Sequence, residues 1–598
     1  MAARSVAARV LFLVAIAAVA MAQDGMSVLE TFGFQRARGD TPRPLFNALV
    51  YAATWTLCVT AIAVLLLHPW RWLRGLGFAA VLFLSSVHVG FGAVNGIGFG
   101  HHEAALLWSE SQFAGSALQF FAPYFLGPVA LWAAVWAVLF WLGSRLAFRR
   151  GALAALALAG VASFAAVELT RQTFGKVYQF PPAVRVPVLT HWAWAHKIPF
   201  YGKREAPRLE PRQAPLTDHL VLVMDESVSG HWLGVNGASP DVTPWLSSGP
   251  PGVFNYGLAS SISNLSSSTN LLLQAGLRPD QLPDRELRAL RSANVFDYLG
   301  RAGFRTALID AQSYSRRPPN LMTRFDLDAI DHHWQLKQLH PELAEHAVDG
   351  ASLPLLEELL ATSPRSFSYV IKNGAHLPYS DKFPRSHALA DTHGVSKTLL
   401  DYAAAVGWSS DGYLEALARA IEASGEEALV IYTADHGQSL EEPDFEPGRD
   451  VSPHATAIDP PAAQASVPLI LLAFGPRTRA AIEARFHPVL VDRASGFEIF
   501  STLLESAGYA RDELGDFSAS LFDAEALRRE RLFASGNVFA QEGGFYVLNP
   551  DIGSACHLNR FEAPPARRVL PVDPGGSGDT RGEAGRETDT SPRGSGTS

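Results

Sequence analysis

The sequence predicts an N-terminal bundle of about five membrane-spanning helices, followed by an α/β domain with a mainly parallel sheet. Two observations support this division. Residues 1–170 contain ten Arg, no Lys and six acidic residues, and long charge-free stretches separate these charges. The remaining residues carry a net charge of −13, against −9 for the whole chain. In that part, apolar runs typical of strands alternate with amphipathic helical patterns, as expected for an α/β domain.

The composition excludes several classes of protein. Charged residues make up 18% of the 598 residues, below the roughly 25% that is usual in soluble proteins. The negative net charge argues against a nucleic-acid-binding protein. Only two cysteines occur, Cys58 and Cys556, so the sequence predicts neither a disulfide framework nor a zinc site built from cysteines.

Charge-free windows mark the predicted membrane spans, which are Val10–Gln23, Pro44–Trp70, Gly75–His102, Ser111–Ser144 and Gly151–Val167. A helix needs about 20 residues to cross about 30 Å of hydrocarbon, so the middle three windows are long enough. The first and last windows fit a crossing if flanking side chains extend to the interface. The alternative for residues 1–22 is a cleaved signal peptide, because Arg4 and Arg9 precede a short apolar stretch that ends at Ala22.

The arginine distribution predicts the orientation in the membrane. With a cytoplasmic N-terminus, seven Arg lie on the cytoplasmic side and three, mixed with acidic residues, lie on the other side. The positive-inside rule then places the α/β domain outside the cytoplasm, whether or not residues 1–22 are removed. We interpret His101, His102 and Glu103 as part of a solvated loop between two spans.

We expect a transmembrane domain over residues 1–170, a linker over 171–215, the α/β domain over 216–563 and a disordered tail over 564–598, which is rich in Gly, Pro, Ser, Thr and charge. The predicted strands are His219–Met224, Arg305–Ile309, Ser366–Ile371, Ala428–Thr433 and Val467–Ala473. The predicted helices are Leu287–Ala302, Gly412–Ala423 and Phe497–Ala507. Sites in sheets of this kind form at the carboxyl ends of the strands.

Acidic and histidine side chains follow three of the predicted strands. Asp225 and Glu226 follow the first, His376 follows the third, and Asp435 with His436 follows the fourth. Carboxylates together with imidazoles are ligands that zinc or manganese accepts. Taken singly, His376 and the later His454 would be ordinary solvated loop residues, but their order after the strands favours a metal site.

Four consecutive hydroxyl residues, Ser266 to Thr269, precede an apolar run with helical spacing. A nucleophile at a helix N-terminus lies near free backbone N–H groups and the positive end of the helix dipole. A bound metal would lower the pKa of such a hydroxyl further. The alternative interpretation is an ordinary serine-rich helix cap.

With these motifs in this order, the chain resembles the membrane-bound phosphoethanolamine transferases of the alkaline phosphatase and sulfatase superfamily, which include lipid A-modifying enzymes. The resemblance covers roughly residues 5–545 in layout and short segments in detail. It implies that Glu226, in Asp-Glu-Ser, and Asp435 and His436, in Asp-His-Gly-Gln-Ser, bind zinc. It also implies that His376 and His454 bind the substrate phosphate or a second metal, so one or two Zn²⁺, or Mn²⁺, are expected.

The resemblance implies Ser266 as the nucleophile and as a further metal contact, because Thr269 at +3 and Leu273 at +7 match the family spacing. Ser267, Ser268 and Thr269 remain rival nucleophiles. A sulfatase that forms formylglycine would need Pro and Arg two and four residues after the nucleophile. Those positions hold Ser268 and Asn270, which counts against a sulfatase.

The implied function is transfer of phosphoethanolamine from phosphatidylethanolamine to a cell-envelope acceptor, which could be lipid A, a core sugar or another glycan, through a covalent phospho-enzyme. The implied location is the bacterial inner membrane, with several spans and the catalytic domain, residues 216–563, in the periplasm. Three alternatives stay open. They are a phosphoglycerol transferase of the lipoteichoic acid type, a membrane-bound metal-dependent phosphodiesterase or sulfatase-like hydrolase, and a non-enzymatic membrane scaffold whose metal site has decayed.

Overall fold

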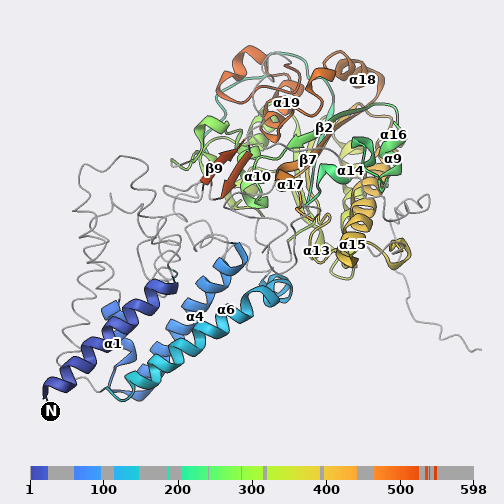
Figure 1. Cartoon of the computed structure of the whole chain (residues 1–598). Coiled ribbons are helices and arrows are strands. Elements are labelled where there is room, and N and C mark those ends of the chain that lie inside the picture. Colours follow the sequence, from blue (N-terminus) through green and yellow to red (C-terminus); the bar gives the residue numbers. More distant parts are fainter. Residues whose placement is uncertain are drawn as a thin grey trace, which may run out of the picture.

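The structure, a computed structural model, describes residues 2–23, 59–95, 114–146, 186 and 204–548, the last range with gaps at 240, 285, 314–318, 323, 391–395, 441–461, 524–532, 537 and 539–544. Figure 1 shows two parts, an elongated group of N-terminal helices and an α/β domain. The long N-terminal helices are α1 (Ala2–Gln23), α4 (Arg71–Asn95) and α6 (Ala114–Gly143).

A seven-stranded sheet forms the centre of the α/β domain, in the order β2-β7-β6-β1-β5-β3-β4. Its strands are β1 (His219–Asp225), β2 (Val253–Ser260), β3 (Arg305–Asp310), β4 (His332–Gln335), β5 (Ser366–Ile371), β6 (Ala428–Ala434) and β7 (Ser466–Phe474). Strand β1 runs parallel to β5 and β6, and β3 runs parallel to β4 and β5. Only β7 opposes its neighbours, β2 and β6, so the prediction of a mainly parallel sheet is confirmed. A separate antiparallel pair consists of β8 (Phe533–Gly536) and β9 (Phe545–Leu548).

Helices lie on both sides of the sheet, as the labels around β7 in Figure 1 show. Helices α10, α11 and α19 contact one another on one side, and α14, α16 and the segment that joins α15 to α16 form a second group. The described helices of this domain are α9 (Pro244–Ser247), α10 (Ser266–Ala275), α11 (Val295–Arg301), α12 (Arg324–Leu327), α13 (Leu336–Leu339), α14 (Ser352–Thr362), α15 (Lys397–Val406), the π-helical turn η13 (Gly407–Gly412), α16 (Tyr413–Ser424), α17 (Ala462–Ala465), α18 (Pro476–Glu483) and α19 (Ile499–Ser506).

The central strands are buried along their whole length. Every residue of β1, β6 and β7 is buried, because helices cover both faces of the sheet. This explains why these strands read as continuous runs of Val, Leu and Ile rather than as alternating patterns. The five predicted strands agree with the observed ones to within a residue at each end.

The prediction of one helix over Leu287–Ala302 is wrong in its first half. Leu287 has a left-handed backbone, with φ of 57°, and only a short 3₁₀ turn follows it. Helix α11 begins after Asn294, whose side chain accepts a hydrogen bond from the Asp297 backbone N–H while the Asp297 carboxylate accepts one from Asn294. This reciprocal cap sets the start of the helix.

Two N-terminal helices are long and apolar enough to cross a membrane. These stretches are Arg71–Phe91 in α4 and Phe125–Gly143 in α6, and the apolar part of α1, Ala7–Gln23, is shorter. Only 11% of the α6 stretch is buried, so most of its apolar side chains face outward, as lipid contact requires. Residues 44–58 and the predicted span Gly151–Val167 lie outside the described residues, and five spans therefore remain a prediction.

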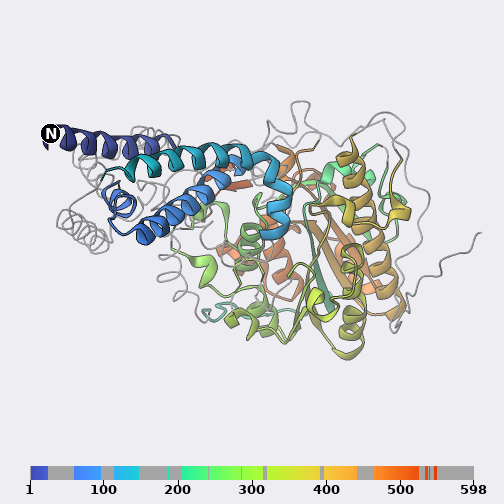
Figure 2. The same cartoon turned by 90° about the horizontal axis from the view of Figure 1, so that it is seen from below.

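Helices α1, α4 and α6 pack on one another through apolar side chains such as Phe12, Ile16 and Leu139. Polar contacts also cross this group: Ser85 Oγ donates to Gln23 Oε1 at 2.9 Å, and the Trp136 indole donates to Ser85 Oγ at 3.1 Å. Polar contacts of this kind hold helices together where water is scarce. Figure 2, seen from below, shows the three helices extending to one side of the α/β domain.

Candidate active site

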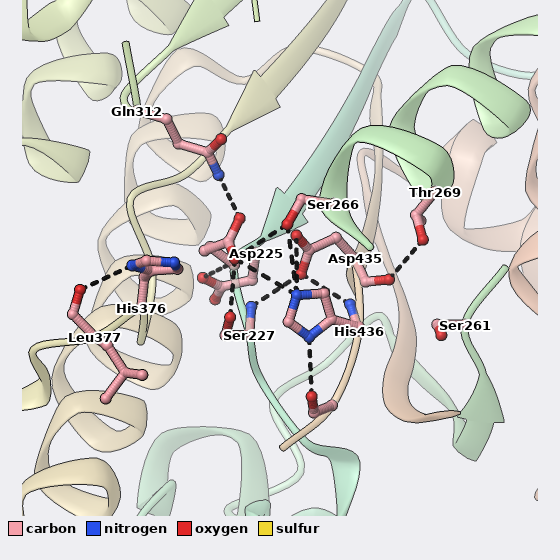
Figure 3. A network of polar contacts seen from close by, with 12 residues as sticks. Asp225, Ser227, Ser261, Ser266, Thr269, Gln312, His376, Leu377, Asp435 and His436 are labelled. Carbon is pink, nitrogen blue, oxygen red and sulfur yellow. Dashed lines mark hydrogen bonds and ion pairs between the residues drawn. The ribbon is translucent and has the colours of Figure 1, made fainter. Parts of the chain in front are cut away.

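Three of the predicted ligands meet at the carboxyl edge of the sheet. Glu226 directly follows β1, and Asp435 and His436 directly follow β6, the neighbouring strand. Each offers a ligand atom that lies within 4.8 Å of the other two, and all three side chains are buried. Figure 3 shows Asp435 and His436 next to each other in this group. The parallel pairing of β1 and β6 brings together residues that are 210 positions apart in the chain.

The Ser266 hydroxyl points into this group. Its Oγ lies 3.3 Å from Glu226 Oε1 and 3.4 Å from His436 Nε2 (Figure 3). Ser266 is partly exposed, whereas the three rival hydroxyl residues that follow it, Ser267, Ser268 and Thr269, are buried. Ser266 is therefore the one of the four that both faces the acidic group and can be reached from outside.

Helix α10 is attached directly to the loop that carries two of these ligands. Thr269 Oγ1 lies 2.9 Å from the Asp435 carbonyl oxygen and 2.8 Å from the Ser263 carbonyl oxygen, so its single hydrogen is shared between these two acceptors. The hydroxyl expected three residues after Ser266 thus connects α10 to the end of β6. The N-terminus of α10 is not capped by a serine, as the alternative interpretation above assumed. Leu265 occupies the N-cap, and Ser266 is the first helical residue.

His436 has a defined orientation. Its Nδ1 lies 2.9 Å from the Gly437 carbonyl, which can only accept, so Nδ1 carries the hydrogen and Nε2 keeps its lone pair. That Nε2 atom faces Glu226 Oε1 at 3.7 Å. Metal-binding histidines commonly show this arrangement, in which a carbonyl fixes the tautomer.

Asp435 carries a buried carboxylate oxygen with no hydrogen-bond partner. Its Oδ1 accepts from the backbone N–H groups of Ser227 and His436, at 2.9 and 2.8 Å. Its Oδ2 is buried, and none of the described residues donates to it. Burial and the neighbouring Glu226 carboxylate raise the pKa of Asp435 to about 7. An unpaired oxygen beside a second carboxylate and an imidazole lone pair is a donor set that fits a divalent cation such as zinc.

Ser227 adopts a left-handed backbone, with φ of 62°, at the centre of the site. A non-glycine residue in this region costs roughly 1–3 kcal/mol and is held in place by its surroundings. Its N–H donates to Asp435, its hydroxyl donates to Glu226 Oε1 at 2.8 Å, and its carbonyl accepts from Tyr402. The strained turn therefore joins the ends of β1 and β6.

Asp225 does not belong to the ligand group, although it precedes Glu226. Lys372 Nζ donates to its Oδ2 at 2.7 Å, and both side chains are fully buried. Ser410 and Tyr432 donate to the same oxygen, each at 2.9 Å. Burial raises the pKa of Asp225, and the Lys372 charge opposes this shift. All the acceptor positions of Oδ2 are thus taken by the protein.

The structure brings one of the two other predicted histidines near the site. His376 lies in the loop after β5, half-buried, with Nδ1 at 2.8 Å from the Leu377 carbonyl. Burial and the charge of Lys382 lower its pKa to about 4, so its ring is neutral at neutral pH. The charge of Asp435 acts on this pKa in the opposite direction, and Figure 3 shows the His376 ring beside the cluster. His454 lies outside the described residues.

Two contributors to the site were not predicted from the sequence. Gln312 follows β3 and donates through Nε2 to Glu226 Oε2 at 2.7 Å. Lys372 follows β5 and neutralises Asp225. Both stand at strand ends, which is the signal that could have indicated them, but neither residue type suggests metal chemistry by itself.

The fold and this site together define an α/β domain with a buried acid–imidazole group at the carboxyl edge of its sheet. Residues 218–509 match the sulfatase family model. This stretch makes up most of the α/β part of the chain, which is therefore similar to sulfatase domains. No curated protein sequence matches the chain.

Several solved structures match the chain at low sequence identity. The integral membrane lipooligosaccharide phosphoethanolamine transferase A of Neisseria meningitidis is 14% identical, with a TM-score of 0.54, and the match covers 84% of this chain and 98% of that one. The periplasmic domain of the Escherichia coli protein EptC, solved with zinc, is 17% identical, with a TM-score of 0.49 and coverage of 58% and 96%. The lipoteichoic acid synthase LtaP of Listeria monocytogenes is 15% identical, with a TM-score of 0.38 and coverage of 57% and 84%.

Proposed function

We propose that the chain is a membrane-bound transferase that moves phosphoethanolamine from phosphatidylethanolamine to an acceptor of the cell envelope, such as lipid A, a core sugar or another glycan. The observation that carries the proposal is the Ser266 hydroxyl, 3.3 and 3.4 Å from two members of a buried group that fits a divalent metal. The fold shared with phosphoethanolamine transferase A supports it. That match covers 84% of this chain and so includes more than the sulfatase domain.

The proposed reaction has two displacement steps at the phosphorus atom. Ser266 Oγ forms a bond to the phosphorus of the donor, and the bond from phosphorus to the diacylglycerol oxygen breaks. The proton lost by Ser266 is recovered on that oxygen, which leaves as diacylglycerol. An acceptor hydroxyl then attacks the phosphorus of the phospho-enzyme, and Ser266 regains a proton as the free hydroxyl.

Glu226, Asp435 and His436 would hold one zinc ion, or manganese, in contact with Ser266. The positive charge of that ion lowers the pKa of a neighbouring hydroxyl and stabilises the charge that develops on the phosphoryl oxygens. We assign His376 to the phosphoryl group or the leaving oxygen, where the neutral Nε2 could take up a proton and return it to that oxygen. His454 keeps the same proposed role, or that of ligand to a second metal.

We propose that the N-terminal part, residues 1–170, spans the bacterial inner membrane several times and that the catalytic domain lies in the periplasm. The two candidate spans and the arginine asymmetry support this topology. A lipid donor requires the nucleophile to work close to a membrane surface. Attachment to membrane helices meets that requirement.

The test is product analysis with phosphatidylethanolamine labelled in its headgroup. The full chain in detergent should release diacylglycerol and form a phosphoethanolamine adduct on the peptide that contains Ser266. Ser266→Ala should abolish both while zinc content and thermal unfolding stay near wild type. A headgroup passed to water would identify a phosphodiesterase, and reaction with phosphatidylglycerol alone would identify a phosphoglycerol transferase. Full activity in all four single variants from Ser266 to Thr269 would reject this segment as the nucleophile.

A further inference from the structure

Glu226 presents two carboxylate oxygens to different partners. Oε1 accepts from Ser227 Oγ at 2.8 Å, lies 3.3 Å from Ser266 Oγ and faces His436 Nε2 at 3.7 Å. Oε2 instead accepts from the amide nitrogen of Gln312 at 2.7 Å. One oxygen therefore belongs to the ligand group, and the other is held by a side chain from a different strand.

The orientation of the Gln312 amide is determined by its contacts. Nε2 donates to Glu226 Oε2 and also to the Lys372 carbonyl at 2.9 Å. Both partners can only accept, so the nitrogen and not the oxygen must face them. Figure 3 shows the amide nitrogen directed from Gln312 toward the carboxylates.

Gln312 is itself fixed at its backbone. Its N–H donates to Asp310 Oδ1 at 2.9 Å, and the Ser313 N–H donates to the same oxygen at 3.1 Å. Asp310 is the last residue of β3 and is fully buried. The carbonyl at the second contact belongs to Lys372, whose side chain is anchored on Asp225. The amide thus connects the ends of β3, β5 and β1.

We infer that Gln312 is a positioning residue for the metal site, which fixes the Glu226 carboxylate so that Oε1, and not Oε2, faces His436, Asp435 and the Ser266 hydroxyl. This inference rests on the proposed function, because it takes Glu226 as a metal ligand. Without the amide, Oε2 loses its charge-assisted hydrogen bond and the carboxylate is free to rotate. Loss of such an outer partner typically weakens metal binding ~10–100-fold.

The experiment measures zinc affinity of the detergent-solubilised full chain by competition with a chromophoric chelator. Gln312→Leu keeps the volume of the side chain and removes the donor, and it should weaken zinc binding ~10–100-fold. Gln312→Ala provides a second variant in case leucine disturbs folding. The matched control is Gln335→Ala, which removes an amide that approaches the other oxygen of Asp310 at 3.5 Å, and it should leave zinc affinity unchanged.

Unchanged zinc affinity in both Gln312 variants would overturn the inference while leaving the proposed function intact. A rise in KM for phosphatidylethanolamine at saturating zinc, with no change in zinc affinity, would also overturn it, because Gln312 would then contact substrate. An equal loss in Gln335→Ala would show that the Asp310 turn, and not the amide, is responsible. A wild-type chain that binds no zinc would overturn the metal site of the proposed function and this inference together.

Discussion

The ends of β1 and β6 each carry a fully buried aspartate, and the protein surrounds the two in opposite ways. Asp225 Oδ2 receives three hydrogen bonds, one of them from the buried ammonium group of Lys372. Asp435 Oδ2 receives none from the described residues. Burial raises the pKa of both. Burial alone therefore does not distinguish the two aspartates, and the unsatisfied oxygen is the feature that marks Asp435, and not Asp225, as a candidate ligand.

Removing the unsatisfied carboxylate should have the largest effect. We expect Asp435→Asn to lose zinc and transferase activity, because an amide is a weaker ligand than a carboxylate. The same variant without metal should unfold at a higher temperature than the metal-free wild type, because repulsion with Glu226 is removed. Elemental analysis and thermal unfolding in a chelator check both points. Normal zinc content in Asp435→Asn would show that Asp435, like Asp225, is not a metal ligand.

Removing the partner of the satisfied carboxylate should instead affect folding. Lys372→Met leaves Asp225 buried without its counter-charge, and we expect a loss of about 3–5 kcal/mol in the free energy of unfolding. The double variant Asp225→Asn with Lys372→Met should recover most of the lost free energy of unfolding, because no unpaired charge remains. Denaturant unfolding of the single and double variants measures this. A stable Lys372→Met protein would contradict the structural role of the pair.

The pH dependence of the metal-free protein should reveal the buried Asp435 carboxyl group. The pKa of Asp435 is about 7 in the folded chain, against a reference of 3.8. Between these values the folded state binds the proton that the unfolded state has released, so stability falls as pH rises. The contribution is at most ~1.4 kcal/mol per pH unit. Unfolding curves in a chelator near pH 5 and pH 7 should show the decline in wild type, and Asp435→Asn should reduce it.

The smallest expected effect concerns one donor to Asp225. Tyr432→Phe removes a single hydrogen bond and leaves Lys372 and Ser410 in place. We expect a loss of about 1 kcal/mol in the free energy of unfolding and no change in zinc affinity. A marked drop in zinc binding in this variant would mean that Asp225 takes part in the metal site after all.

The sequence predicted the sheet well because its central strands are continuous apolar runs. It did not predict β2, where Gly257 has a φ of 75° and a register shift interrupts the pattern, or β4, which has only four residues. These features depend on pairing partners far along the chain. Local periodicity carries no information about them.

The candidate site likewise contains some residues that the sequence could indicate and others that it could not. Glu226, Asp435 and His436 could be singled out because each follows a predicted strand and the family resemblance implied a metal-binding role, and the structure brings the three side chains together. Gln312 and Lys372 could not, since their contacts depend on the spatial order β1-β5-β3, which brings together strand ends that are distant in sequence. The metal-binding roles of the three predicted ligands, and the roles of Ser266, His376 and His454, stay predictions.

The hydroxyl of Thr269 has a consequence for any attempt to transplant this site. Because it is bonded to the Asp435 carbonyl, a displacement of α10 carries the end of β6 with it, and the spacing between Ser266 and Asp435 is preserved. Grafting Ser266 and its acidic neighbours onto another scaffold would copy the chemical groups. It would not copy the Thr269 contact that holds the helix to the strand end. The minimal portable unit is therefore the first turn of the helix together with the strand end to which it is tied.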